Sequence, residues 1–253
     1  MAADEQPNPT LPGHAAEPPT EDDYAPILPG PGASDYERYL RTDELLALQK
    51  PAAERFHHDE LLFQTVHQSS ELWLKLAASE VETAAAHLAK DEIAPSLRLL
   101  RRASMCLSFI TGQLEMLEQM SPWEYTRFLR PALGHGSGFD SPGFREARRV
   151  SPLLGQEFHR IRRAAELSIA DVYVQGRERE DLYQLAEALV DWDERLNVWR
   201  FRHYKVVARI IGDEMVGTQG TPVEVLGGLI KNKLYPELWD ARNQLTSLAK
   251  ESD

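Results

Sequence analysis

Apolar residues return at helical spacing through most of the chain beyond residue 34, and this pattern predicts a protein built of helices. In the longest stretches, 59–90, 92–119 and 178–211, aliphatic residues recur every three or four positions. Shorter helices are expected at 34–46, 122–129, 156–174, 223–231 and 236–249. No segment shows the alternation of a strand, so the expected fold class is all-α, a bundle of long antiparallel helices.

Two glycine-rich segments interrupt the helical pattern and are expected to form loops. Residues 134–143 read GHGSGFDSPG and residues 213–222 read DEMVGTQGTP. Gly212, directly before the second loop, is a plausible end for the preceding helix. Neither loop follows a strand or carries the G-x-x-x-x-G-K-[ST] pattern, so a nucleotide site is not expected.

The first 33 residues differ from the remainder in composition. They hold six acidic residues, no lysine or arginine, and eight of the sixteen prolines. Such a segment cannot bury a core. We therefore predict a disordered acidic leader over 1–33 and one helical domain over 34–253.

Charge and cysteine content narrow the partners and the compartment. The net charge of −12 argues against nucleic-acid binding, which needs a basic surface. No apolar run approaches the roughly 18 to 20 residues of a membrane helix, and the N-terminus lacks the pattern of a secretion signal. Cys106 is the only cysteine, so no internal disulfide can form, and a cytoplasmic protein is expected.

His203 lies on the apolar face of the last long predicted helix. Trp199 precedes it by four residues, and Val206 and Ile210 follow it by three and seven, which is the spacing of one helix face. A neutral imidazole in this setting is typical of an axial haem ligand. The other interpretation is a core histidine bonded to a carbonyl, and helical spacing by itself favours this one.

Three further residues are candidates for binding or catalysis. His67 shares a mixed stripe with Phe63, four residues earlier, which suits either a distal base or a helix contact. Arg145 follows the first loop beside phenylalanines, where it could clamp a carboxylate or lie at the surface. Thr218 in the second loop could donate to the same ligand or serve only the turn.

A two-iron centre is disfavoured by the sequence. Helical bundles that hold two irons use two Glu-x-x-His pairs. Glu54 and His57 form one such pair, and no second one exists.

Six segments between residues 35 and 245 are similar, in this order, to those of the tryptophan 2,3-dioxygenase family. They are YERYLR (36–41), HHDELLFQTVHQSSELWLKL (57–76), SGFDSPGFR (137–145), VWRFRHYKVVARIIG (198–212), GTQGT (217–221) and YPELWDAR (235–242). The resemblance implies a helical bundle that encloses haem b, with O₂ as co-substrate. It also implies addition of oxygen across indole C2–C3 of a tryptophan-like amino acid, which gives N-formylkynurenine.

The resemblance assigns a role to each of these candidate residues. His203 corresponds to the proximal haem ligand, and His67 to the distal histidine that meets the indole N–H. Phe63 corresponds to a pocket phenylalanine. Arg145 corresponds to the arginine that pairs with the substrate carboxylate, and Thr218 to the threonine near the substrate's ammonium and carboxylate groups.

The resemblance also implies an oligomer. Tyr36 and Tyr39 correspond to tyrosines that reach the pocket of a neighbouring subunit. A homo-oligomer is therefore expected, either a dimer or the tetramer typical of the family.

Three differences from the family pattern bear on the reaction. The stretch 149–179 is shorter than expected for the family. Asp140 and Pro142 stand in SGFDSP, where the family usually has SGFQS. Gln219 stands in GTQGTP, where the family usually has GTGGSS, so this loop should be less mobile.

These differences leave alternative functions open. One is a haem-dependent monooxygenase of specialised metabolism that gives a 2-oxindole or hydroxylated product from a substituted tryptophan. Another is a helical protein that binds haem or a ligand without catalysis.

Overall fold

The computed structural model describes residues 24–251, in two compact units that divide after Gln49. Residues 1–23, most of the predicted leader, lie outside the described part. In the first unit α1 (Asp35–Leu40) and α2 (Thr42–Leu46) follow one another. The Asp35 carboxylate accepts the backbone N–H groups of Ile27 and Leu28, so residues 24–33 are tied to α1.

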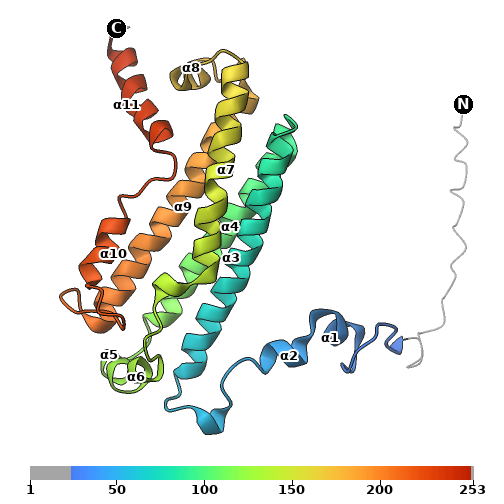
Figure 1. The fold of residues 1–253 in the computed structure, drawn as a ribbon, viewed down its shortest axis with the longest axis vertical. Helices are drawn as coiled ribbons and strands as arrows, with labels where there is room; N and C mark the ends of the chain where they lie inside the picture. Colours follow the sequence, from blue (N-terminus) through green and yellow to red (C-terminus); the bar gives the residue numbers. More distant parts are fainter. Residues whose placement is uncertain (1–23, 252–253) are drawn as a thin grey trace, which may run out of the picture. The chain divides into compact units, whose positions relative to one another are not determined.

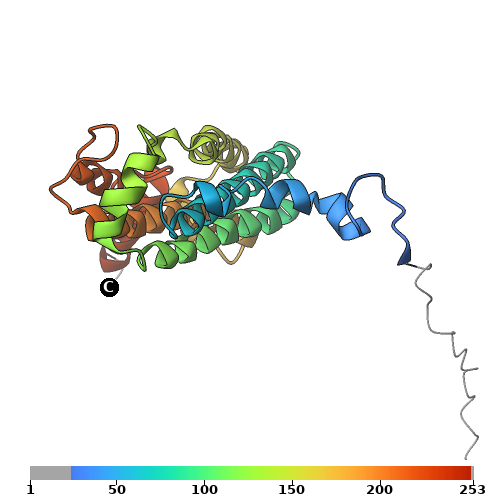
Figure 2. The same cartoon turned by 90° about the horizontal axis from the view of Figure 1, so that it is seen from below.

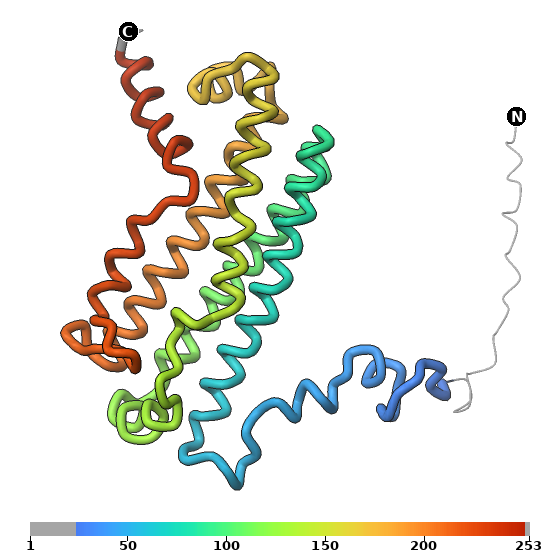
Figure 3. Tube along the Cα trace, in the orientation of Figure 1, coloured from blue at the N-terminus to red at the C-terminus, as the bar shows by residue number. Residues whose placement is uncertain are grey.

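Four long helices form the second unit and run along one axis (Figure 1). They are α3 (Glu60–Leu88), α4 (Ile93–Leu117), α7 (Pro142–Ala164) and α9 (Glu180–Ile211). Along the chain these helices alternate in direction, so α3 and α7 run one way and α4 and α9 run the other (Figures 1 and 3). The main contacts pair α3 with α4, which are antiparallel, and α4 with α9 and α3 with α7, which are parallel. The predicted all-α class is confirmed: residues 24–251 contain one isolated β-bridge and no strand.

Short helices connect and flank the bundle, which Figure 2 shows from below. They are the 3-10 turns η2 (Ala52–Glu54) and η4 (Gly138–Asp140), the π-helical turn η3 (Tyr125–Leu129), and α5 (Pro122–Glu124), α6 (Arg130–Ala132), α8 (Ile169–Val174), α10 (Val223–Leu229) and α11 (Pro236–Glu251).

The prediction for the segment after the first loop is wrong. A helix was expected over 156–174, but α7 begins at Pro142, and a turn at Glu166 separates it from α8. Ser141 caps α7 and accepts the Phe144 N–H, with Pro142 at the first helical position. The glycines and prolines around this cap resemble a loop in composition, which concealed the start of the helix.

Aliphatic residues of the four long helices make the main core, which includes the fully buried Trp192 and Phe158. Asp193 is also fully buried there. Its carboxylate accepts the Trp239 indole N–H at 2.9 Å, the Leu234 N–H at 3.0 Å and the Asn197 amide at 3.1 Å. This carboxylate therefore joins α9 to the start of α11.

The end of α9 leads into the second loop. Gly212 ends α9 with φ of +94°, a conformation that favours glycine, which confirms it as the helix stop. A second cluster of buried residues, Val66, Leu114, Leu117, Met120, Leu129, Val206 and Ile210, packs at this end of the bundle. None of the helices in the described part of the chain is both long and apolar enough to cross a membrane.

Candidate functional site

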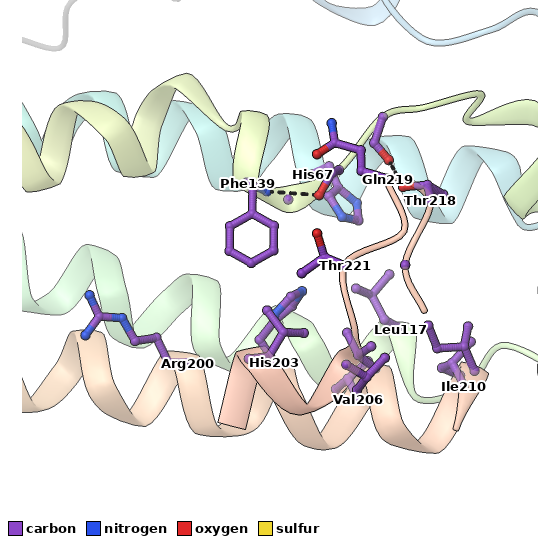
Figure 4. A pocket seen from close by; sticks show the side chains of 18 of the residues that line it. His67, Leu117, Phe139, Arg200, His203, Val206, Ile210, Thr218, Gln219 and Thr221 are labelled. Carbon is purple, nitrogen blue, oxygen red and sulfur yellow. Dashed lines mark hydrogen bonds between the residues drawn. The ribbon is translucent and has the colours of Figure 1, made fainter. Parts of the chain in front are cut away.

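A cavity of about 300 Å³ opens at the end of the bundle where α9 meets the two glycine-rich loops (Figure 4). Its walls come from α3, η3, α7, α9, α10 and both loops, with one residue each from α4 and α6. Its lining is largely aliphatic and aromatic, with a few polar groups, as in most sites for small ligands. The sequence predicted five residues here, and four of them line the cavity: Phe63, His67, His203 and Thr218.

His203 presents its ring to the cavity from the apolar face of α9. Trp199, one turn earlier, stacks on the imidazole with ring centres 4.8 Å apart and an interplanar angle of 9°. The imidazole makes no hydrogen bond to any residue within 24–251. Burial, and to a lesser degree the neighbouring His67, lowers the pKa of His203 to about 4, so the ring is neutral at physiological pH.

One ring nitrogen of His67 is hydrogen-bonded to the backbone, and the other is available as an acceptor. Its Nδ1 lies 2.7 Å from the Phe63 carbonyl oxygen. Because a carbonyl only accepts, Nδ1 carries the proton of the neutral ring, and Nε2 is an acceptor. The ring is open to the cavity, yet burial in the surrounding protein lowers its pKa, against the effects of that bond and of Glu71.

Phe63 holds the His67 ring in place. The two rings stack with centres 4.0 Å apart, and Phe63 also contacts Tyr125 at 6.3 Å. Since Phe63 lies one turn before His67 on α3, helical periodicity alone places both residues on one wall of the cavity.

The second loop is bonded to the first loop across the cavity mouth. The Thr218 hydroxyl donates to the Gly136 carbonyl at 2.5 Å. Arg130 donates to the carbonyl of Val216 at 2.7 Å. Thr218 is thus fixed by its own hydrogen bond at the edge of the cavity.

Two of the residues that differ from the family pattern meet in this contact. The Gln219 amide donates to Asp140 Oδ2 at 2.7 Å, and the same oxygen accepts the Ser137 N–H at 3.1 Å. Asp140 and Gln219 lie 79 positions apart in the chain. Their hydrogen bond joins the two glycine-rich loops through side chains.

Arg145 does not line the cavity and lies at the surface, which is the alternative that its sequence setting left open. It donates to the Asp140 carbonyl at 3.1 Å. Arg130 is half-buried and lines the cavity instead. It directly follows the π-helical turn Tyr125–Leu129. A π turn holds one residue more than α periodicity allows for, so the face of Arg130 was not predictable from spacing.

Tyr36 and Tyr39 belong to the first unit. Both lie on α1, and their side chains are 69% and 78% exposed. They are therefore accessible in the single chain, and their role remains a prediction.

The residues around His203 fit a haem. Its imidazole is neutral and stacked on Trp199, and no described residue bonds its nitrogens, so a nitrogen is available to bind iron. A Cβ atom at Gly138 would lie only 4.0 Å from Nε2, so the missing side chain leaves this nitrogen accessible. Within residues 24–251 no group of three or more histidine, cysteine, aspartate or glutamate side chains could hold a metal ion.

Fold and site thus define an all-α protein in which histidines from α3 and α9 reach one apolar cavity. A family model described as tryptophan 2,3-dioxygenase matches residues 30–167 and 159–245. The chain therefore belongs to the tryptophan 2,3-dioxygenase family, a family of haem-dependent oxidoreductases.

Proteins named tryptophan 2,3-dioxygenase are similar to the chain over most of its length. That of Bacillus thuringiensis subsp. konkukian is 33% identical over 83% of this chain and 92% of its own. That of a Bradyrhizobium species is 34% identical over 85% and 94%. That of Saccharopolyspora erythraea is 33% identical over 83% and 92%.

These relatives carry residues that this chain lacks. The alignment with the Bacillus thuringiensis protein spans 264 positions but covers only 83% of the 253 residues here, so it contains gaps in this chain. The two segments of the family match overlap at 159–167. This break falls within the stretch 149–179 that the sequence analysis found to be short.

Proposed function

We propose that the protein is a haem-dependent oxygenase that inserts oxygen from O₂ into the indole ring of L-tryptophan or a substituted tryptophan, with N-formylkynurenine as the product from tryptophan itself. The observation that carries this proposal is the placement of His67 and His203 on one apolar cavity, in a chain of the tryptophan 2,3-dioxygenase family.

His203 would hold haem b as a neutral imidazole. The low pKa removes the competing proton, and the stacked Trp199 keeps the ring in one orientation. When bound, ferrous haem supplies the centre that binds O₂.

His67 would position the indole and accept a hydrogen bond from it. With Nδ1–H fixed to the Phe63 carbonyl, Nε2 is the acceptor that faces the remaining space. Its lowered pKa keeps this nitrogen unprotonated, so it can accept the indole N–H proton or its hydrogen bond. Phe63 would pack against the aromatic ring of the substrate.

The amino-acid end of the substrate requires a cation for its carboxylate. The resemblance assigns this role to Arg145. The cavity lining favours Arg130 instead, because Arg130 lines the cavity and donates to the Val216 carbonyl, two residues before Thr218. We propose that Arg130 pairs with the carboxylate and that Thr218 contacts the same end. Fixing both ends of the substrate lowers the entropy cost of reaction.

The active form is proposed to be a homo-oligomer, a dimer or a tetramer, that works in the cytoplasm. Exposed Tyr36 and Tyr39 on α1 would complete the cavity of a neighbouring subunit. The single, buried Cys106 is compatible with a reducing compartment.

The test is mass spectrometry of the product formed from L-tryptophan under ¹⁸O₂ by the haem-loaded protein. Two labelled oxygen atoms in N-formylkynurenine are expected. One labelled atom would replace dioxygenation by the monooxygenase alternative. A protein that binds haem but consumes neither tryptophan nor its methylated analogues would be the non-catalytic alternative.

A further inference from the structure

The cavity has an excess of positive charge. Arg130, Arg148 and Arg200 all line it, and no aspartate or glutamate is among the described residues of its lining. Arg130 donates one hydrogen bond to the Val216 carbonyl of the second loop and is the proposed partner of the substrate carboxylate. The other two arginines come from α7 and α9 and require a separate explanation.

The Arg200 guanidinium is fixed by hydrogen bonds, but no carboxylate is bonded to it. It is half-buried, and its guanidinium donates to the Asn197 side chain and to the Asn232 carbonyl, both at 2.9 Å. These acceptors are neutral, so they orient the group without cancelling its charge. Burial lowers the pKa of Arg200 and the neighbouring Arg148 lowers it further, whereas Asp193 opposes them.

Arg148 has no partner of its own. It makes no hydrogen bond or ion pair with any residue between 24 and 251. The adjacent Arg149, by contrast, bonds the carboxylates of Glu82 and Glu146. The acids near this part of α7 are therefore used by Arg149, and Arg148 is left beside the like charge of Arg200.

We propose that Arg148 and Arg200 form a carboxylate-binding site on the α7–α9 side of the cavity, and that this site holds a propionate of haem b. The inference rests on the proposed function. Two guanidinium groups that face one space without an acid are stabilised by a bound anion, and guanidinium pairs with a carboxylate in bidentate geometry.

The position of the pair on α9 favours haem as the source of the carboxylate. Arg200 lies three residues before His203, about 5 Å along the helix axis, so a group that His203 ligates is within reach of an arginine side chain. Figure 4 shows Arg200 on one side of His203, and Thr218 and Gln219 on the other. The substrate carboxylate is thereby left to Arg130 at the loops.

Esterification of the propionates tests the proposal directly. Full-length apoprotein is titrated with haem b and with its dimethyl ester, which keeps the macrocycle and iron but removes both charges, and the Soret band is followed. We expect wild-type protein to bind haem b at least about tenfold more tightly than the ester, a difference of 1.4 kcal/mol. In Arg148→Met the preference should shrink to about threefold or less, while the spectrum of a histidine-ligated haem persists.

Two further variants separate the site from general effects on charge or folding. Arg163→Met removes an exposed arginine of α7 outside the cavity and should keep the full preference. Arg148→Lys should recover part of it. Equal binding of haem b and its ester by wild-type protein, or an undiminished preference in Arg148→Met, overturns the proposal. Absence of haem binding altogether removes the proposed function as well.

A substrate arm distinguishes the two sources of carboxylate. Tryptamine lacks the carboxylate of tryptophan, so the ratio of the two affinities reports the contact with that group. Arg148→Met should leave this ratio at the wild-type value. If instead the variant loses the preference for tryptophan and keeps that for haem b over its ester, the pair binds substrate and the assignment to haem is wrong.

Discussion

Asp193 and His203 are ten residues apart on α9, and their surroundings are opposite: Asp193 is fully buried, whereas His203 is half-buried and faces the cavity. The Asp193 carboxylate accepts hydrogen bonds from Trp239, Asn197 and the backbone before α11. The His203 imidazole stacks on Trp199, faces the cavity and makes no hydrogen bond to any residue within 24–251. The polar group in the first half of α9, the Asp193 carboxylate, is hydrogen-bonded, whereas the one in the second half, the His203 imidazole, is not.

This difference in hydrogen bonding identifies Asp193 as a structural group and His203 as a group available for binding. Burial of a charge is tolerated when hydrogen bonds replace its hydration, and those bonds then fix one arrangement of the helices. An imidazole that is buried without a partner costs free energy until something bonds it. The first half of α9 therefore stabilises the bundle, and the second half is available to a ligand.

The largest expected effect is the loss of haem in His203→Ala. With no other neutral imidazole at this position on α9, the Soret band of a histidine-ligated haem should disappear. Free imidazole should restore part of it by filling the vacated space. His87→Ala, which removes a histidine bonded to Glu92 outside the cavity, is the control. A normal spectrum in His203→Ala would exclude His203 as the ligand.

The structural half of α9 should respond in stability rather than in ligand binding. Asp193→Ala leaves several buried donors unpaired, and the free energy of unfolding should fall by about 3 to 5 kcal/mol. Urea unfolding of the apoprotein measures this. Asp191→Ala removes only a half-exposed carboxylate paired with Arg195, and should cost less than about 1 kcal/mol. Similar losses in both variants would show that Asp193 has no special structural role.

The next effect compares the two arginines of the loop region. Arg130→Leu should lower kcat/KM for tryptophan about 100-fold, chiefly through KM, because it removes the proposed partner of the carboxylate. Arg145→Leu should change it less than about threefold. Tryptamine turnover, which involves no carboxylate, should be nearly the same in wild type and Arg130→Leu. The reverse ranking would restore Arg145 to the role that the resemblance gives it.

The sequence could predict the site residues that lie on regular helices but not those that lie at irregular backbone. His67, Phe63 and His203 lie on long helices, where positions three, four and seven apart share a face, so their convergence on a cavity follows from spacing once the helices pack. Arg130 and Arg145 flank loops and a π turn, where no period relates position to direction. The contact between Asp140 and Gln219 depends on how two distant loops meet, which no local pattern contains.

A smaller effect concerns the stability of the apoprotein in mild acid. The pKa of His203 in the folded protein is about 4, below the value of 6.5 for a free imidazole. As pH falls below 6.5 the unfolded chain binds a proton that the folded protein does not, so stability falls until about pH 4 and then levels off. The part due to His203 should be about 1 to 2 kcal/mol, because contact with the cavity retains some hydration. His203→Gln should show a shallower fall; an identical pH profile would refute this assignment.

The smallest expected effect is at the loop contact that distinguishes this chain from the family pattern. Gln219→Ala removes the hydrogen bond to Asp140 but keeps a side chain, whereas Gln219→Gly also restores backbone freedom. Loss of one bond of this kind costs about 1 kcal/mol, so amide exchange over 217–221 should rise about fivefold in the first variant and further in the second. The Asp140→Ala variant should not add to the effect of Gln219→Ala at these amides, because both remove the same bond. Additive effects would mean that the two residues hold their loops independently, and that the altered loops are not coupled across the cavity mouth.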